Sequence, residues 1–412
     1  METSEAPRRI LLVHDRYRLP GGEDAVFAAE RALLEKHGHT VTVYERANSE
    51  VDGHPLRKLL LPFTALFSLR TVRQVRALIR EEQIELVHVH NTLLVVSPSV
   101  FWACFREKVP VVQTLHNFRL FCPNGILLRG GKVCEDCPHH GLTCAVRHRC
   151  YRGSAAQSLI CAGVYGLHRL LGTYRRVNLI AITEFDRAKL NEFNALTKRP
   201  VYNPDNLWVK PHFVDIPAAL LAAPPTPWPA RKNRMVYAAR LEELKGLPTA
   251  IRAWGRLAHT PNAPTLLVAG LGPLEEWARD EVRKTGAPVE FAGQLEKPAL
   301  LALLADSRAA VVPSLCYESF ALVPAEAHAL GTPVLASDTG NVGAAVREGA
   351  DGLHFPPGDD AALAAAVMAL CGQGPALDLA DIRRTALDAY GPEENYARLM
   401  KIYESMLEER KL

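Results

Sequence analysis

The stretch that decides the fold is Ala309-Ala-Val-Val-Pro-Ser-Leu-Cys-Tyr-Glu318-Ser-Phe-Ala-Leu-Val-Pro-Ala-Glu326. Its apolar start, Ala309–Val312, predicts a buried strand, and Pro324–Leu330 predicts a helix. A strand, a loop and a helix in this order are typical of a parallel sheet, which binds ligands beyond the carboxyl ends of its strands. Glu318 therefore lies on a ligand-facing loop, and Glu326 lies in the first turn of the predicted helix.

The same alternation extends in both directions from this stretch. In the second half it predicts strands at Met235–Ala238, Thr265–Ala269, Val289–Ala292 and Val334–Ala336, and helices near Leu247–Leu257, Leu274–Thr285 and Asp359–Cys371. In the first half it predicts strands at Ile10–Val13, Val41–Tyr44, Leu86–Val89, Val111–Leu115 and Leu179–Ile182, and a helix from Glu23 to His37. The fold class is therefore α/β, with two Rossmann-like, doubly wound domains that face each other across a cleft.

The domain boundaries follow from length and composition. A chain of 412 residues fits two domains, and the proline-rich segment 216–232 has no strand-like run and predicts a linker. We therefore assign residues 1–215 to a first domain, which carries a cysteine-rich insertion at 118–153. Residues 233–392 form a second domain of similar type. A last helix, 393–412, follows Gly391-Pro392 and is expected to cross back to the first domain.

Composition and charge exclude several classes of protein. With 48% hydrophobic and 23% charged residues, the chain is neither disordered, collagen-like nor a disulfide-stabilised miniprotein. Residues 51–215 hold 22 basic and 12 acidic side chains, which indicates an anionic surface or ligand for this half. No segment has the ~20 apolar residues of a membrane-spanning helix, and residues 1–9 lack an apolar signal core. We therefore expect a cytoplasmic protein.

The second half carries residues suited to a nucleoside diphosphate. Arg240 and Lys245 follow a predicted strand, where two cations suit a diphosphate, and a carboxylate such as Glu326 can accept two ribose hydroxyls. Gly270-Leu-Gly-Pro273 allows close approach of the backbone. Taken singly, these features also fit solvated charges, a helix cap and a turn. Their ordered occurrence at successive strand ends favours a nucleotide site.

These motifs resemble those of family 4 glycosyltransferases, which have the GT-B fold, and the resemblance covers nearly the whole chain. It rests on Arg240, Lys245-Gly246, Gly270-Leu-Gly-Pro273, Pro313-Ser314, Glu318 to Glu326, Gly331-Thr-Pro-Val334, Gly21-Gly22, Val87-His88-Val89-His90 and Thr114-Leu-His116. After Gly340 this family often has a second glycine and a Pro-Glu pair. Here the residues are Asn341-Val-Gly343, so this turn does not identify the donor.

The resemblance also implies that residues 1–215 are the acceptor-side domain and that residues 233–392 are the nucleotide-sugar domain. It further implies roles for the residues of these motifs. Arg240 and Lys245 would bind the donor diphosphate, Glu326 the ribose, and Glu318 would face the transferred sugar. The backbones of Gly21, Gly22 and Gly272 would approach the donor, and His116 would lie near the sugar, although a structural strand-end histidine is an alternative. The family retains anomeric configuration and needs no essential catalytic metal. His88 and His90 alternate on a predicted strand and are expected to face opposite sides.

Five of the nine cysteines lie between residues 122 and 150. Disulfides are rare in the cytosol, and a Cys-x2-Cys pair lets two thiolates converge on one ion. We assign Cys122, Cys134, Cys137 and Cys150 to a structural zinc site. Substitute ligands are Cys144, His139, His140 and His148. An iron–sulfur cluster, free thiols or a disulfide pair remain alternatives. The segment resembles a cysteine-bearing insertion in a subset of bacterial family 4 enzymes.

Residues 57–80 combine six Lys or Arg side chains with a leucine- and phenylalanine-rich pattern and no acidic residue. This suits a helix lying on an anionic bilayer, although an amphipathic core helix with a solvated basic face is equally compatible. Nucleic acid is not expected, because no recognition motif accompanies the charge.

The expected function is that of a retaining glycosyltransferase. It would transfer a hexosyl unit from a nucleoside diphosphate sugar to a lipid-linked cell-surface glycan, at the inner face of the membrane. The alternatives are a nucleotide-sugar epimerase with the same fold and a catalytically silent protein that binds a nucleotide or a partner. The donor base, the sugar and the oligomeric state stay open.

Overall fold

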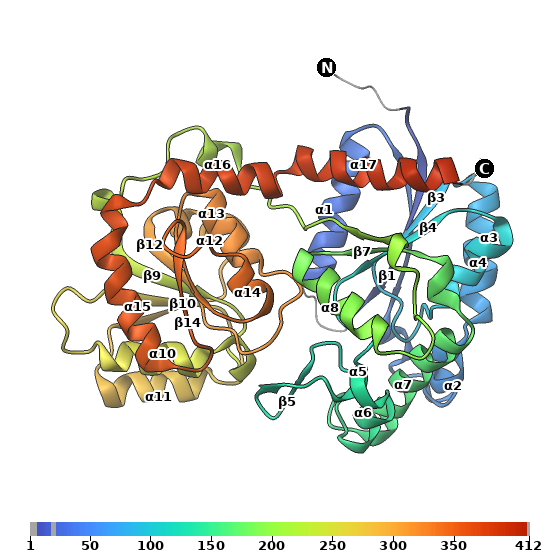
Figure 1. The fold of residues 1–412 in the computed structure, drawn as a ribbon, viewed down its shortest axis with the longest axis horizontal. Coiled ribbons are helices and arrows are strands. Elements are labelled where there is room, and N and C mark those ends of the chain that lie inside the picture. Colours follow the sequence, from blue (N-terminus) through green and yellow to red (C-terminus); the bar gives the residue numbers. More distant parts are fainter. Residues whose placement is uncertain (1–5, 18–21, 410–412) are drawn as a thin grey trace. The chain divides into compact units, whose positions relative to one another are not determined.

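The computed structural model describes residues 6–17 and 22–409 and divides them into two compact units. Residues 128–133 and 213–394 form the second unit, and the other described residues form the first. Each unit is a twisted sheet with helices packed on its faces (Figure 1). Gly21, one of the predicted donor contacts, lies outside the described residues.

The first unit is built on a sheet of six parallel strands in the order β2-β1-β3-β4-β7-β8. The strands are β1 (Arg9–Arg16), β2 (Thr40–Ala47), β3 (Leu86–Val89), β4 (Val111–Leu115), β7 (Asn178–Ala181) and β8 (Leu207–Val209). The apolar run at the start of β1 is fully buried, as expected for a strand covered on both faces. The order reverses between β1 and β3, so polar side chains beyond these two strands are placed for ligand binding.

Helices cover this first sheet on both faces. They are α1 (Gly22–Lys36), α2 (Pro55–Leu66), α3 (Leu69–Glu81), α4 (Val100–Glu107), α7 (Ala155–Leu170) and α8 (Glu184–Ala195). The last helix of the chain, α17 (Pro392–Glu409), belongs to this unit from Asn395 onward. It buries Leu399, Met400 and Tyr403 in the same core as Ile10 and Leu12 of β1. The predicted return of the last helix to the first domain is therefore confirmed.

The second unit has six parallel strands in the order β11-β10-β9-β12-β13-β14. They are β9 (Lys232–Ala238), β10 (Thr265–Ala269), β11 (Val289–Gly293), β12 (Ser307–Val312), β13 (Val334–Ser337) and β14 (Gly352–Phe355). In chain order this is 3-2-1-4-5-6, the arrangement of Rossmann dinucleotide-binding sheets. The topological switch point therefore lies between β9 and β12, the strands that precede Arg240 and Glu318.

The helices of the second unit alternate with these strands. They are α9 (Ala218–Leu221), α10 (Leu247–Arg256), α11 (Glu275–Thr285), α12 (Lys297–Ala305), α13 (Leu322–Ala329), α14 (Gly340–Ala344), α15 (Asp360–Gln373) and α16 (Leu379–Tyr390). Helix α13 begins two residues before its predicted start, so Glu326 lies in its second turn and not in its first. No single described helix has the length and apolar composition to cross a membrane, although the bent pair formed by 360–376 and 379–408 passes that test together.

Two predicted elements differ from the structure in their extent. The basic segment 57–80 is two helices, because α2 ends at Leu66 and Ser68 caps α3 by accepting a hydrogen bond from the Thr71 amide. The cysteine-rich insertion contains a short hairpin, β5 (Leu128–Arg129) with β6 (Lys132–Val133), and two one-turn helices, α5 (Asp136–His140) and α6 (Thr143–Arg147).

Candidate functional site

An ion pair joins the two loops at the switch point of the second sheet. Lys245 Nζ lies 2.8 Å from Glu318 Oε2, and both side chains are partly buried. The Ser314 hydroxyl donates a hydrogen bond to the other carboxylate oxygen of Glu318. Burial alone would lower the pKa of Lys245, but Glu318 outweighs it and raises that pKa above its usual value. Lys245 is therefore a fixed cation beside an oriented carboxylate.

Three glycines let these loops pack closely. Gly246 has a φ of +69°, and a Cβ built on it would lie 1.8 Å from the Pro313 carbonyl oxygen. A Cβ on Gly270 would lie 2.0 Å from the Ala239 carbonyl oxygen. The predicted donor contact Gly272 packs similarly tightly, with 2.4 Å between its built Cβ and the Leu241 carbonyl oxygen. The first function of these glycines is thus to bring the loops after β9, β10 and β12 together.

A matched pair of alanine variants tests this packing role. Gly246→Ala should destabilise the second unit by about 1–3 kcal/mol more than Gly286→Ala. Both glycines have nearly the same left-handed φ, +69° and +67°, but nothing lies within 4 Å of a Cβ on Gly286. Urea unfolding of the two variants measures the difference. If the two variants have equal urea midpoints and equal dependence of the unfolding free energy on urea, Gly246 does not pack closely against Pro313.

Glu326 is held at the same sheet edge but in a different environment. Its side chain is buried, and its Oε1 lies 3.1 Å from Lys297 Nζ of α12. Burial raises the pKa of Glu326, and Lys297 partly opposes that shift. A buried carboxylate with one lysine partner keeps acceptor capacity for further donors, such as a pair of hydroxyl groups.

Arg240 borders a cavity at the ends of β9, β10 and β11. The cavity has a volume of ≈ 350 Å³, and its lining includes Gly270, Gln294 and Leu300 beside Arg240. The Arg240 side chain is 60% exposed, and its Nε lies 3.4 Å from Glu242 Oε2. Such a loosely held cation at the mouth of a cavity can turn toward an anionic ligand at little cost.

The turn after Gly340 departs from the family pattern, and the structure shows what Asn341 does there. Its amide nitrogen donates hydrogen bonds to the carbonyl oxygens of Glu318, at 2.6 Å, and of Ser319, at 2.9 Å. Asn341 therefore anchors the loop that carries the switch-point carboxylate. This contact and the Ser314 hydrogen bond were not predicted, because both depend on loop geometry that the sequence pattern does not encode.

The predicted residues of the first half belong to the first unit. Gly22 is the first residue of α1, and His116 follows β4 directly, with its side chain half-buried. His116 Nε2 lies 3.1 Å from His90 Nδ1, and the two rings are stacked. The structure thus groups Arg240, Lys245, Gly272, Glu318 and Glu326 in one unit and places His116 and Gly22 in the other.

The prediction that His88 and His90 face opposite sides is wrong. His88 Nδ1 lies 3.0 Å and His90 Nε2 lies 3.2 Å from the same oxygen, Glu30 Oε1. The reason is that side chains two positions apart, such as those of residues 88 and 90, lie on the same face of a strand, and only adjacent residues face opposite sides. Glu30 itself was not predicted. Its position on the buried face of α1, among apolar residues, was the signal that could have found it.

Two of the cysteines of the insertion are in contact with each other. The thiols of Cys122 and Cys137 are hydrogen-bonded, which lowers the pKa of Cys122 to about 6. Among the residues that the structure describes, three or more metal-ligand atoms lie within 4.8 Å of one another only in the group Glu30, His88 and His90. The four-cysteine zinc site therefore stays a prediction.

Comparison with known families matches both halves of the chain to glycosyltransferases. Residues 21–133 match the model "Glycosyltransferase Family 4", and residues 222–382 match "Glycosyl transferases group 1". A glycogen synthase of Mycobacterium tuberculosis is 43% identical over 148 residues, which are 34% of this chain and 36% of that protein. The phosphatidyl-myo-inositol mannosyltransferase of Mycobacterium leprae is 29% identical over 188 residues, 43% of this chain and 48% of that protein. The chain thus matches between about a third and a half of the length of these relatives.

Solved structures agree on the fold. The HepE protein of Anabaena, solved in complex with UDP, superimposes with a TM-score of 0.63 over 96% of this chain and 100% of its own, at 18% identity. Two α/β units with six parallel strands each, together with this likeness, show that the chain has the GT-B fold. The family matches of both halves support a transferase.

Proposed function

We propose that this protein is a retaining glycosyltransferase that transfers a hexosyl unit from a nucleoside diphosphate sugar to a glycan acceptor. The observation that carries the proposal is the Lys245–Glu318 pair at the switch point of a Rossmann-order sheet, at the same sheet edge as the cavity that Arg240 lines. A site of this kind places fixed cations where a nucleoside diphosphate lies on such sheets. The solved complex of HepE with UDP supports a nucleotide donor.

The loss of the nucleoside diphosphate from the donor sugar explains the role of each residue at this site. When the bond between the sugar and the diphosphate breaks, negative charge develops on the leaving phosphate, and preorganised cations stabilise that charge. Lys245 is such a cation, because Glu318 and the surrounding loops hold it in place. Arg240 is exposed enough to close on the phosphate from the cavity side. Glu326 would accept hydrogen bonds from the ribose hydroxyls.

Retention of configuration follows from transfer on the face that the diphosphate leaves. In such a front-face transfer the departing phosphate oxygen accepts the proton of the acceptor hydroxyl, while that hydroxyl forms the new bond to the sugar carbon. The protein then needs to orient the two partners and stabilise charge, and it needs no separate general base. The surroundings of Lys245 agree with this mechanism. The carboxylate there, Glu318, already binds Lys245 and the Ser314 hydroxyl and is not a free base.

The experiment that tests the proposal is a donor panel. The purified protein is incubated with nucleotide sugars that differ in base and sugar, with and without glycan acceptors, and diphosphate release is measured. Release that depends on an acceptor supports transfer. Conversion of the donor sugar without any acceptor would instead show an epimerase, and no affinity for any nucleoside diphosphate would show a silent binding protein.

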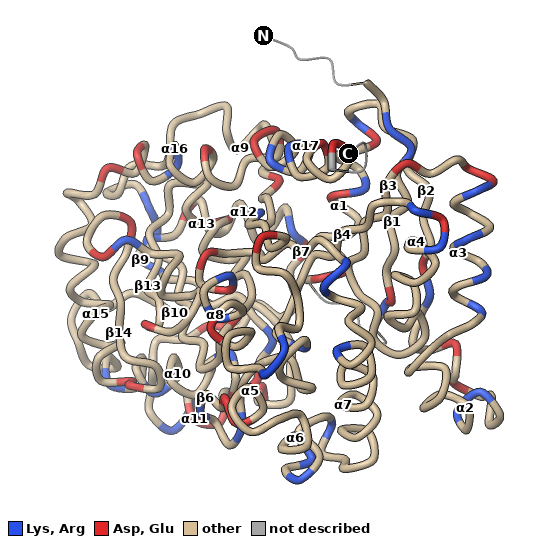
Figure 2. The backbone as a smooth tube through the Cα atoms, turned by 45° about the vertical axis from the view of Figure 1, so that its right-hand side comes forward, with Lys and Arg blue, Asp and Glu red and all other residues tan. Residues whose placement is uncertain are grey.

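We also propose an anionic, lipid-linked acceptor at a membrane, based on the exposed face of α2. Four large apolar side chains lie one or two turns apart on this helix, Leu56, Leu59, Leu60 and Phe63, and they are 73%, 70%, 51% and 69% exposed. Figure 2 shows basic residues along α2 and α3, where cations would meet anionic head groups. The M. leprae relative is a mannosyltransferase named for phosphatidyl-myo-inositol, a lipid, and this supports such an acceptor.

Vesicle binding tests this face. A Leu59→Glu/Phe63→Glu variant should bind phosphatidylglycerol-containing vesicles about 100-fold more weakly than the wild-type protein, because two large side chains lose their apolar environment. Leu196→Glu, at another exposed leucine of the same unit, is the control and should bind normally. Sedimentation with vesicles measures the affinity. Equal binding of the double variant would exclude α2 as the membrane contact.

We further propose that the cysteine-rich insertion holds a structural zinc ion through Cys122, Cys134, Cys137 and Cys150, with Cys144 as a substitute ligand. The spacing supports it, and so does the contact of the Cys122 and Cys137 thiols, since two ligands of one ion must approach closely. Metal analysis of protein purified without chelator should find about one equivalent of zinc. A Cys134→Ser/Cys137→Ser variant should lose it, whereas Cys371→Ser should not.

A further inference from the structure

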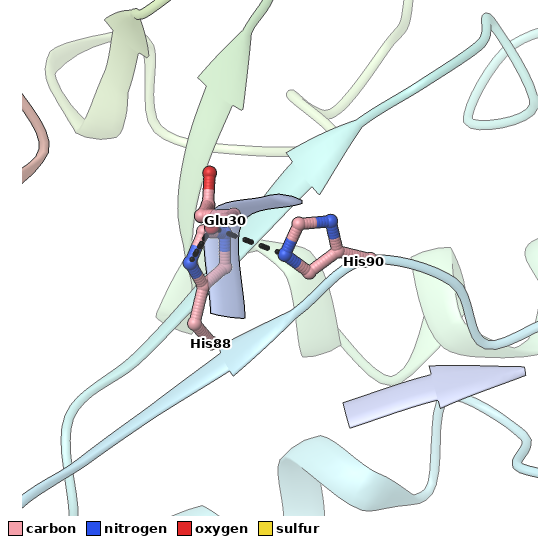
Figure 3. A group of neighbouring side chains, drawn as sticks. All are labelled: Glu30, His88 and His90. Carbon is pink, nitrogen blue, oxygen red and sulfur yellow. Dashed lines mark hydrogen bonds and ion pairs between the residues drawn. The ribbon is translucent and has the colours of Figure 1, made fainter. Parts of the chain in front are cut away.

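A buried carboxylate, Glu30, lies at the centre of a group of six side chains in the first unit. It lies on α1 and is 1% exposed. Figure 3 shows the imidazoles of His88 and His90 pointing at this carboxylate. Its Oε1 lies 3.0 Å from His88 Nδ1 and 3.2 Å from His90 Nε2, and its Oε2 lies 2.8 Å from Lys210 Nζ. Two residues of α17 complete the group: Asn395 Oδ1 is 3.0 Å from Lys210 Nζ, and the Tyr403 hydroxyl is 2.8 Å from His88 Nδ1.

The charge state of this group follows from its neighbours. Burial would raise the pKa of Glu30, but Lys210, His88 and His90 together hold it well below its usual value. Burial also lowers the pKa of His90 to about 4. At neutral pH Glu30 is therefore an anion that only accepts hydrogen bonds, and His90 is neutral with one ring proton.

These charge states fix the direction of two hydrogen bonds. Because Glu30 accepts, His90 must carry its proton on Nε2, which leaves its Nδ1 as an acceptor. His116 Nε2 lies 3.1 Å from that Nδ1 and must therefore be the donor. Burial, together with His212 and His90, lowers the pKa of His116, so this ring is also neutral. Its remaining nitrogen, Nδ1, is then an acceptor.

A metal ion is the other use that this group could have, since two histidines and one carboxylate form a common ligand set. The surrounding contacts argue against it. Lys210 is buried and already neutralises Glu30, and His88 Nε2 is 2.8 Å from the Thr114 hydroxyl while its Nδ1 meets Tyr403. A divalent cation would have to displace a buried ammonium group and these hydrogen bonds.

We propose that Glu30 is a positioning residue that acts through His90 to hold His116 with its proton on Nε2, so that His116 Nδ1 accepts a hydrogen bond from a hydroxyl of the donor sugar. The identity of the ligand rests on the function proposed above, whereas the proton arrangement does not. His116 lines a cavity of ≈ 20 Å³, which is enough for one water-sized group such as a hydroxyl. In this role His116 orients the sugar and does not remove a proton.

The first test observes the proton arrangement directly, by NMR of protein labelled with ¹⁵N at histidine. We expect a protected Nε2–H signal for His116 and a scalar coupling from its Nε2 to His90 Nδ1 across the hydrogen bond. Both should be lost in Glu30→Met/Lys210→Met, which removes the two buried charges together. Thr114→Val, which removes the hydroxyl that contacts His88 Nε2, should keep them. A proton on Nδ1 of His116, or a coupling that persists in the double variant, would overturn the proposal.

The second test separates the sugar from the nucleotide. The same double variant should bind the nucleoside diphosphate as the wild-type protein does but bind the intact nucleotide sugar about 3–10-fold more weakly, because one hydrogen bond to the sugar is lost. If that variant does not fold, His90→Phe keeps the ring stacking and removes the relay, and it should show the same selective loss. Unchanged affinity for the sugar nucleotide in the variant that folds overturns the role of the group.

The outcomes distinguish this inference from the proposed function. A wild-type protein with the expected coupling but without glycosyl transfer would refute the transferase and leave the proton relay in place. Zinc or another divalent ion bound at one equivalent, and lost only in the Glu30→Met/Lys210→Met variant, would show a metal site and overturn the relay.

Discussion

Lys245→Ala should lower kcat for sugar transfer by about 10²–10³-fold, the usual cost of removing one preorganised group that stabilises charge in the transition state. Lys245 is suited to this role because it is held by Glu318 at 2.8 Å, so little reorganisation is needed when charge develops on the leaving phosphate. Initial rates of diphosphate release at saturating donor measure the effect.

The control for this variant is Lys284→Ala, which removes a lysine of the same unit whose side chain is 72% exposed. It should leave kcat unchanged. Lys245→Arg should recover part of the rate, since it restores the charge but not the geometry. If the Lys245→Ala variant folds and its kcat equals that of the wild-type protein, Lys245 does not stabilise the leaving phosphate and the proposed site is wrong.

Glu326→Gln should weaken binding of nucleoside diphosphates by about 10–100-fold, because a charged acceptor of ribose hydroxyls becomes a neutral amide. The effect belongs to binding, so KM for the donor should rise with little change in kcat. Calorimetric titration with diphosphates of different bases measures it. The variant retains the size of the side chain, which keeps the packing of α13 intact.

Glu290→Gln, at an exposed position of β11, is the matched control and should bind the diphosphate normally. The complementary ligand is the nucleoside without its phosphates. Because it keeps the ribose hydroxyls, its affinity should also fall in Glu326→Gln. If only diphosphate-bearing ligands are affected, Glu326 contacts the phosphates and its assignment to the ribose is wrong.

Much of the fold could be predicted because parallel sheets leave a strong local pattern. Strands such as Val111–Leu115 and Thr265–Ala269 are short apolar runs bounded by turns, and the structure has them at these residues. The short strands β8 and β14 were missed, as was α16. Leu207–Val209 offers only three residues, too few for a periodic signal, and becomes a strand because β7 pairs with it.

The site was predictable only where its residues are close in sequence. Glu318 and Lys245 could be recognised from motifs at strand ends, but their ion pair depends on two loops that are far apart along the chain. The group around Glu30 is harder still to predict, because its members come from α1, from β3 and the residue after it, from the segment after β8 and from α17. Tertiary structure alone brings Lys210 next to Glu30. No local sequence pattern indicates a buried ion pair between two residues that are 180 positions apart in the chain.

The course of α17 has a consequence for how the chain acquires its structure during synthesis. Leu399, Met400 and Tyr403 belong to the core of a unit whose first strand, β1, is synthesised long before them. On the ribosome the second unit has all its strands before this helix emerges, so it can fold first although it is the later one. The first unit cannot complete its apolar core until α17 has left the ribosome. This interval is when the nascent chain most needs protection by a chaperone.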